Sequence, residues 1–212
     1  MKNIILTALL CTLGLVAVRA QPTWQWGKRG GSSFNESSIS APDEQVIDMA
    51  TDKNGNVYVL SQVYANANDI NVDGNPVTGR GNRDILLSSF RCNGTYRWSK
   101  LFGAVQADIG VAVETDTIGG VYVTGRMFYY NSSNTAHLST DTTLTTSPRS
   151  TFLAKYDTAG TYKWVRRPQA DTAYFISNPT APLDMDVDGA GNIYWLCTLA
   201  PSNYVNGSYP VS

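Results

Sequence analysis

The chain has few of the residues from which active sites and metal centres are usually built. It contains one histidine, His137, and its three cysteines form no CxxC pair. Zinc sites need closely grouped ligands and Ser-His-Asp or Cys-His catalysis needs a base beside the nucleophile, so neither is supported. Only three glutamates occur, and the facing carboxylates of a glycosidase are correspondingly scarce. We predict no catalytic residue and no cofactor.

An excess of positive charge is also absent. The 16 lysines and arginines are balanced by 17 aspartates and glutamates, which gives a formal net charge of −1. The densest basic cluster is Lys163, Arg166 and Arg167. Binding to a nucleic acid backbone requires clustered cations that displace counterions, so we predict no nucleic acid partner.

Long apolar runs are absent beyond the N-terminus. There, Lys2 precedes an apolar run from Ile4 to Val18, and the small residue Ala20 follows it. This pattern is typical of a secretory signal peptide, here residues 1–20. A membrane anchor is the alternative, but a span needs roughly 20 apolar residues. We therefore expect a cleaved leader, a mature chain without a membrane span, and a secreted or cell-surface location.

One segment of the sequence is written three times. Residues 46–59, 111–123 and 183–195 each contain an apolar strand, an Asp-x-x-Gly turn and a second strand that carries a tyrosine. The spacing between copies exceeds one hairpin and matches about one small sheet, which indicates a repeat architecture. The shared positions are Asp52, Gly55, Tyr58, Asp116, Gly119, Tyr122, Asp188, Gly191 and Tyr194.

A second segment recurs between these copies. Residues 84–98 and 151–164 each contain an apolar strand, a glycine turn and an aromatic-x-Trp strand that ends at Trp98 or Trp164. Tyr96 and Trp98 are two residues apart, so we expect both on one face of their strand. We interpret such pairs as core between neighbouring sheets; a ring of aromatics that stacks on sugars is the alternative.

The same pattern occurs once more near the N-terminus. Trp24-x-Trp26 matches the aromatic-x-Trp strand, and Gly31 follows Trp26 by five residues as Gly103 follows Trp98. We predict an orphan copy of the last strand over residues 23–28.

These segments predict an all-β chain. No stretch after the leader has the 3.6-residue spacing of a helix, whereas short β-branched and aromatic runs alternate between turns rich in Gly, Asn and Asp. Each unit holds four strands, which for the first unit are about 46–51, 56–62, 84–90 and 95–100. Four antiparallel strands per unit are typical of a propeller blade. We interpret residues 21–212 as an incomplete β-propeller domain.

The repeats give this domain about two and a half units. Unit one covers about 46–103, unit two about 111–167, and a partial unit three about 183–212. Closed propellers use about four to eight blades, so this number cannot close a ring. We predict a truncated chain whose exposed sheet edges or faces self-associate; an open arc that pairs its edges with another chain is the alternative.

The stretch DILLSSFRCNGTYRWSKLFGAVQADIGVAVETDTIGGVYVTG, residues 84–125, resembles the bacterial β-propeller repeat called SBBP. The resemblance rests on a Trp strand, a Gly-containing link, an Asp turn and a Tyr-Val-x-Gly strand, and it extends over nearly all of the mature chain. It implies an exported or surface protein of Bacteroidetes-like bacteria, often multi-domain with a C-terminal sorting domain, and it carries no catalytic residues. The chain departs from the pattern at Trp195-Leu196-Cys197, which indicates a distorted or terminal unit.

Two further sites are weighed from the residues. Asp184, Asp186 and Asp188 resemble the start of a calcium loop, in which oxygen ligands alternate. The acid expected at loop position 12 is replaced by Trp195, so a polar strand leading into a turn is the favoured interpretation and calcium the alternative. Removal of the leader leaves Cys92 and Cys197. An even number of cysteines in an exported chain permits one disulfide; two free thiols are the alternative.

Two long polar loops, 65–83 and 129–150, interrupt the repeats, each with room for a weak extra strand. Loops on a rigid scaffold are the usual place for recognition. We therefore expect a secreted or cell-surface, non-enzymatic binding or structural module with a protein or glycan ligand. The alternative is a fragment of a secreted propeller enzyme, a hydrolase or a quinoprotein, whose catalytic parts lie outside this chain. His137, in the second loop, is expected to be solvated.

Overall fold

The structure, a computed structural model, describes residues 25–32, 44–65, 70–128, 135–138, 143–144, 149–167 and 181–198. The predicted signal peptide, Trp24 and the last residues of the predicted third unit lie outside these ranges. Within them every regular element is a strand and none is a helix, so the all-β prediction is confirmed. In the same ranges, no apolar helix is long enough to cross a membrane.

Two four-stranded antiparallel sheets and one two-stranded sheet follow one another along the chain. Sheet 1 consists of β2 (Gln45–Thr51), β3 (Val57–Tyr64), β6 (Arg83–Phe90) and β7 (Tyr96–Phe102). Sheet 2 consists of β8 (Ile109–Thr115), β9 (Gly120–Phe128), β12 (Arg149–Asp157) and β13 (Tyr162–Arg166). Sheet 3 is the hairpin of β14 (Ala181–Val187) and β15 (Ile193–Thr198). The prediction of four strands per unit is confirmed for the first two units.

Each long loop forms a small hairpin between the second and third strands of its sheet, rather than a single extra strand. In the first loop, β4 (Ile70–Val72) pairs with β5 (Asn75–Val77) and also with β1 (Gly30–Gly31). In the second loop, β10 (Ala136–His137) pairs with β11 (Thr143–Leu144).

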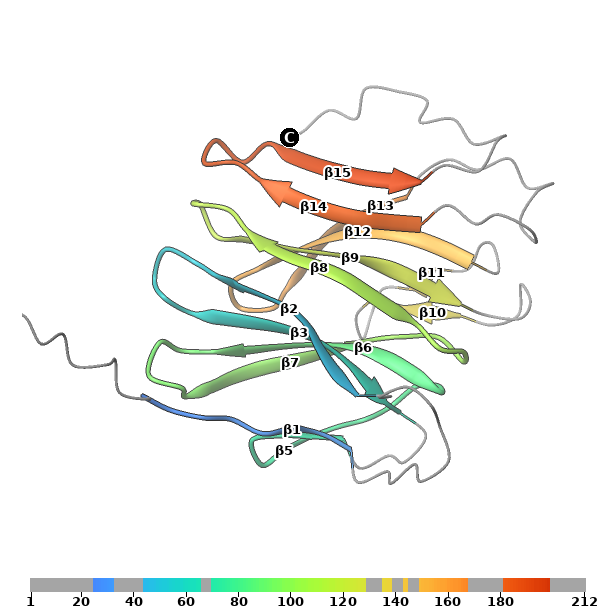
Figure 1. The fold of residues 1–212 in the computed structure, drawn as a ribbon, viewed down its shortest axis with the longest axis horizontal. Helices are drawn as coiled ribbons and strands as arrows, with labels where there is room; N and C mark the ends of the chain where they lie inside the picture. Colours follow the sequence, from blue (N-terminus) through green and yellow to red (C-terminus); the bar gives the residue numbers. More distant parts are fainter. Residues whose placement is uncertain are drawn as a thin grey trace, which may run out of the picture.

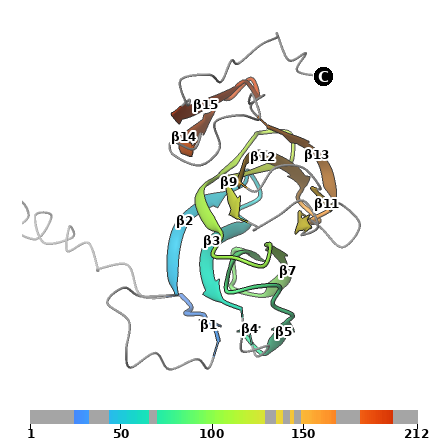
Figure 2. The same ribbon diagram turned by 90° about the vertical axis from the view of Figure 1, so that its right-hand side faces the viewer.

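The three sheets are stacked face to face in sequence order (Figure 1). Their first strands run along one side of the stack, with β2 beside β8 and β8 beside β14. The hairpin turns that join first and second strands lie on one side of the stack, and the β10–β11 hairpin lies on the other (Figure 1). The small sheet of β1, β4 and β5 lies beyond sheet 1, on the side away from sheet 3 (Figures 1 and 2). The described residues form a stack with two open ends and no closed ring.

The hydrophobic core lies between the sheets rather than inside any one of them. Between sheets 1 and 2, apolar residues of the two facing surfaces form the largest cluster, which includes Leu60, Leu87, Val113 and Val123. Between sheets 2 and 3, a smaller cluster forms around Tyr122, Leu153 and Met185. Because strand residues alternate between faces, sheet 2, the middle sheet, contributes to both core layers at once.

A β-bulge corrects one prediction about the aromatic pairs. Tyr96 is paired with Phe90 and Trp98 with Ser89, so Arg97 is an extra residue between them. Tyr96 consequently packs on the outer face of sheet 1, whereas Trp98 packs towards sheet 2. The expectation that the two rings share a face is wrong, because a bulge shifts the alternation by one residue.

Candidate functional site

The aspartate turns form a hydrogen-bonded unit that recurs in all three sheets. Asp52 Oδ1 accepts the backbone N–H groups of Asn54 and Asn56, and Asp52 Oδ2 accepts the Tyr58 hydroxyl at 2.9 Å. The next glycine, Gly55, has a positive φ of 73°, which closes the turn. Each turn thus binds its own tyrosine on the following strand.

The second and third copies repeat these contacts. The hydroxyl of Tyr122 donates to Asp116 Oδ2 at 2.7 Å, and that of Tyr194 donates to Asp188 Oδ2 at 3.3 Å. Gly119 also has positive φ, at 106°. The predicted repeat positions are therefore equivalent in the structure.

The tyrosines of the three copies differ in how deeply they are buried. Tyr58 and Tyr122 are buried, whereas Tyr194 is 59% exposed, since no described strand covers the outer face of sheet 3. Burial, supported by the hydrogen bond and the charge of Asp52, raises the pKa of Tyr58 to about 12, although the hydrogen bond from Arg97 acts in the opposite direction. Burial raises the pKa of Asp116, but its hydrogen bonds, first from the Gly120 backbone, outweigh this and lower it overall. The aspartates of these turns are therefore ionised turn anchors.

Tryptophans join sheets 1 and 2 to the segment that precedes each of them. The Trp98 indole donates its N–H to the Thr158 carbonyl of sheet 2 at 3.0 Å. The Trp26 indole donates to the Cys92 carbonyl of sheet 1 at 2.9 Å. Cys92 and Thr158 occupy the same position in the repeat. Trp26 is thus a true copy of Trp98, as the sequence predicts.

The segment that carries Trp26 is nevertheless not the predicted strand. Residues 25–29 have no regular structure, and the strand nearby is Gly30–Gly31, paired with β4. The prediction of a strand over 23–28 is corrected for its described part. The indole bond and the packing of Trp26 on Phe90, with ring centroids 6.1 Å apart, hold the segment in place without a strand partner along it.

Carboxylates form a second recurring connection. Asp108 Oδ2 accepts the backbone N–H of Ala104, and its Oδ1 accepts that of Phe128, both at 2.7 Å. Glu44 occupies the equivalent position of sheet 1, and its Oε1 accepts the N–H groups of Ser32 and Tyr64 at 2.8 and 3.2 Å. Each acid therefore binds the tail of the preceding unit to the end of the second strand of its own sheet.

Asp84 makes the connection at Asp108 a buried acid pair. Both carboxyl groups are fully buried. Asp84 Oδ2 accepts the Arg80 N–H at 2.7 Å, whereas the described residues supply no donor to Oδ1. Asp108 is close enough that a proton on one carboxyl is shared with the other. Gly103 is required here, since a Cβ would collide with Asp84 Oδ1.

Burial raises the pKa of Asp84 to about 7 and that of Asp108 to about 8. Two negative charges side by side are unfavourable when both groups are removed from water, so the pair holds a proton at neutral pH. The sequence interpretation, which assigned most aspartates to turns, missed this pair. The sequence carries one signal of the pair: Asp84 has no acidic counterpart in the second unit, where Ser150 occupies the equivalent position.

His137 lies near this pair and is half-buried rather than solvated. Its backbone N–H and carbonyl pair with Gly103. Burial lowers its pKa, with a smaller contribution from Arg80. The expectation of a solvated loop histidine is wrong, because the second small hairpin packs back onto the β7–β8 connection.

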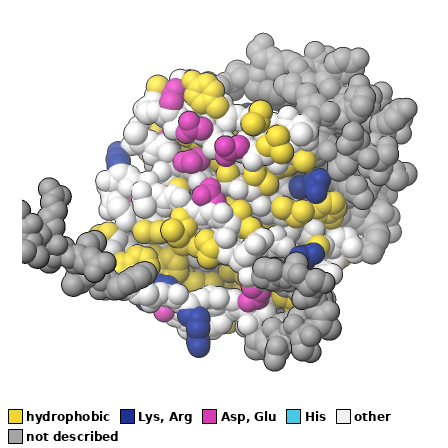
Figure 3. All heavy atoms as spheres, viewed as in Figure 1, with side chains coloured by type: hydrophobic (Ala, Val, Ile, Leu, Met, Phe, Trp, Pro, Cys, Tyr) yellow, Lys and Arg dark blue, Asp and Glu magenta, His cyan; other side chains and the backbone are white. Residues whose placement is uncertain are grey.

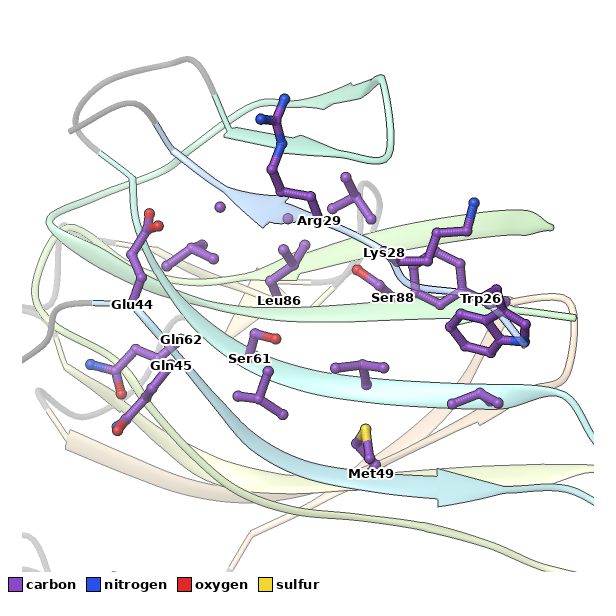
Figure 4. A pocket seen from close by; sticks show the side chains of 18 residues that line it. Trp26, Lys28, Arg29, Glu44, Gln45, Met49, Ser61, Gln62, Leu86 and Ser88 are labelled. Carbon is purple, nitrogen blue, oxygen red and sulfur yellow. The ribbon is translucent and has the colours of Figure 1, made fainter. Parts of the chain in front are cut away.

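A groove of 390 Å³ runs along the outer face of sheet 1. The N-terminal segment forms one wall, and side chains of β2 and β3 form the floor (Figure 4). Trp26 lies at one end and Glu44 at the other, with Met49 on the floor. Val57 and Val59 also line it. The groove is mostly apolar, with the charged residues at its rim.

The predicted calcium residues are engaged in local hydrogen bonds. Asp188 serves its turn, while Asp184 and Asp186 each accept the N–H of the next residue. Among the described residues, no three His, Cys, Asp or Glu side chains are grouped to hold a metal ion. Several acidic side chains instead lie near one another on one face of the molecule (Figure 3). Burial raises the pKa of Glu114, and the nearby charges of Asp48, Asp186 and Asp184 add to this.

The two cysteines are free thiols. Cys92 is exposed in the β6–β7 turn of sheet 1, and Cys197 lies in β15 of sheet 3. Sheet 2 lies between the two cysteines, so they form no disulfide bridge in the structure. Burial raises the pKa of Cys197 to about 11, which leaves it a protonated and weakly reactive thiol.

The first predicted recognition loop is partly core. Ile70 and Val72 are buried against sheet 1, together with Leu86. Its tip is exposed, and there Asp73 forms an ion pair with Lys28 at 2.6 Å. Of the second loop, the described part is also packed inward, since Ala136 and Leu138 are fully buried. The first loop therefore offers its tip and not its whole surface for contact.

No family model and no curated protein matches the chain.

Proposed function

We propose that the chain is an exported, non-enzymatic module built of β-propeller blades, which serves as a structural or ligand-binding element outside the cell or on its surface. One observation carries the blade assignment. Successive units are joined by the same contacts, since Trp26 and Trp98 donate to equivalent carbonyls. A repeated junction of this kind is what radial repetition of four-stranded sheets requires.

The use of the polar residues supports a non-enzymatic role. The turn aspartates are ionised anchors for backbone and tyrosine groups. Asp84 and Asp108, the pair with raised pKa, are fully buried and bind loop backbone. Perturbed acids at a catalytic site face a cleft, and these two face the protein interior. The SBBP resemblance, exported location and a protein or glycan ligand belong to this proposal.

The export part is tested by expression of the full chain in a Gram-negative host. We expect the mature protein outside the cytoplasm, with the mass of a chain that begins at Gln21. Cytoplasmic protein of full mass contradicts export.

The binding part is tested on protein and glycan arrays. Exposed residues of the first small hairpin, Pro76 in β5 and Thr78 just after it, are changed to alanine, with Lys53→Ala in the exposed β2–β3 turn as the control. We expect the hairpin variants to lose a signal that the control keeps. Turnover of a substrate by the purified chain contradicts the non-enzymatic assignment.

A further inference from the structure

The stack leaves one apolar face uncovered at each end. On sheet 1, Val46 and Met49 are each 62% exposed. On sheet 3, Tyr194 and Leu196 are each 59% exposed and Leu183 is 53% exposed. Exposed apolar patches of this kind mark contact surfaces, and the repeat itself identifies what covers them.

The face of sheet 1 corresponds to surfaces that pack on a preceding sheet. Met49 occupies the repeat position of Val113 in sheet 2 and of Met185 in sheet 3. Val113 is fully buried against sheet 1, and Met185 is 3% exposed against sheet 2. Val46 matches Gly110, where an added Cβ would lie 3.3 Å from Leu60 of the sheet before it. The open face of sheet 1 is therefore built to receive a preceding sheet.

The face of sheet 3 corresponds to surfaces that pack on a following sheet. Tyr194 occupies the position of Tyr58 and Tyr122, and Leu196 that of Leu60. Those three equivalents are buried, Tyr58 and Leu60 against sheet 2 and Tyr122 against sheet 3. The open face of sheet 3 is therefore built to receive a following sheet whose first two strands carry residues like Met49 and Val57.

The N-terminal segment marks where that preceding sheet belongs. Trp26 relates to sheet 1 as Trp98 of β7 relates to sheet 2, so residues 25–32 stand in the place of a fourth strand. The groove beside this segment leaves the positions of the other strands of a preceding sheet open (Figure 4). Sheet 3 consists of a first and a second strand, β14 and β15. The two ends of the chain are complementary in both residue type and strand position.

We propose that copies of this chain associate head to tail, with sheet 3 of one copy packed on sheet 1 of the next, in the groove beside Trp26. This rests on the proposed blade architecture and names a partner for it, a second copy. The interface is heterologous, since different surfaces of the two copies meet. It continues the sheet-to-sheet core already present twice inside the chain.

Charge gives the association a distinct salt dependence. Head-to-tail packing brings Asp184 and Asp186 of β14 towards Asp48 of the next β2, because first strands lie side by side within the stack. Like charges repel, and the Debye length falls from about 10 Å at 0.1 M salt to about 3 Å at 1 M. Association therefore strengthens as salt is raised.

Sedimentation velocity of the full chain over a range of concentrations tests this. Met49→Arg places a charge on the open face of sheet 1, and Leu196→Arg places one on the open face of sheet 3. Both residues are exposed, so neither variant disturbs the core of the monomer. We expect each variant alone to be monomeric, and an equimolar mixture of the two to form dimers only, because one intact face of each kind remains. Ile118→Arg, at an 80% exposed turn residue, is the control and keeps wild-type association.

Three results overturn the proposal. A wild-type chain that stays monomeric at all concentrations does so, as does association that persists in both arginine variants. A mixture that fails to restore dimers also does so, since it indicates contact between like faces. Cooperative urea unfolding of such a monomer leaves the blade assignment intact, whereas loss of cooperative unfolding in all forms counts against the blades themselves.

Discussion

The three tyrosine-to-phenylalanine variants at Tyr58, Tyr122 and Tyr194 test whether equivalent hydrogen bonds differ in energy with burial and with the partners that remain. At Tyr122, the hydroxyl is the close partner of a buried Asp116 oxygen, and the next donor, Lys155, is 3.5 Å away. A hydrogen bond to a charged group contributes about 1.5 to 3 kcal/mol. We expect Tyr122→Phe to lower the free energy of unfolding by about 2 kcal/mol.

At Tyr58 the loss is smaller, about 1 kcal/mol. Asp52 Oδ2 keeps the Asn56 side-chain amide at 2.8 Å, and Arg97 keeps Ser89 Oγ at 2.9 Å. At Tyr194 the group is exposed and its bond is long, so Tyr194→Phe leaves stability unchanged. Urea unfolding followed by tryptophan fluorescence, with a constant m value, measures all three. Equal losses, or the largest loss at Tyr194, refute the reasoning.

Two more predictions follow from the site. Unfolded aspartates ionise near pH 3.8, whereas Asp84 and Asp108 keep a proton to about pH 7 and 8. The folded state thus binds more protons, and stability falls from pH 5 to pH 7 by about 1.4 kcal/mol per pH unit for each proton that the pair retains. In Asp84→Asn, whose amide replaces that proton, urea unfolding should show a flatter profile; an unchanged slope contradicts this. Gly160→Ala should destabilise by about 1 to 3 kcal/mol more than Gly191→Ala. Both glycines have φ near +80°, but only at Gly160 does a Cβ meet Trp98, at 2.9 Å; equal losses in thermal melts argue against tryptophan packing.

The strands of this chain can be predicted from its sequence because the sequence patterns that define them are local. An Asp-x-x-Gly turn closes through bonds within six residues, as between Asp52 and Tyr58. The strand boundaries predicted for sheet 1 agree with β2, β3, β6 and β7 to within a few residues. The equivalence of Trp26 and Trp98 follows from their spacing to a shared glycine, which repeats with the unit.

The features that sequence reasoning missed depend on contacts between distant segments. Alternation predicts that Tyr96 and Trp98 share a face, but the bulge at Arg97 arises from pairing with β6. The buried pair exists because Asp84 and Asp108, from different sheets, meet behind Gly103. Neither residue carries a local mark of burial.

An all-β chain of repeated units follows from the sequence, since turn chemistry and strand alternation act over a few residues. Which copies are buried depends on how the sheets pack. Tyr58 and Tyr194 have the same neighbours in sequence terms, yet one is fully buried and the other is 59% exposed. Burial depends on the sheet stacked above each residue, and that is a property of the whole stack.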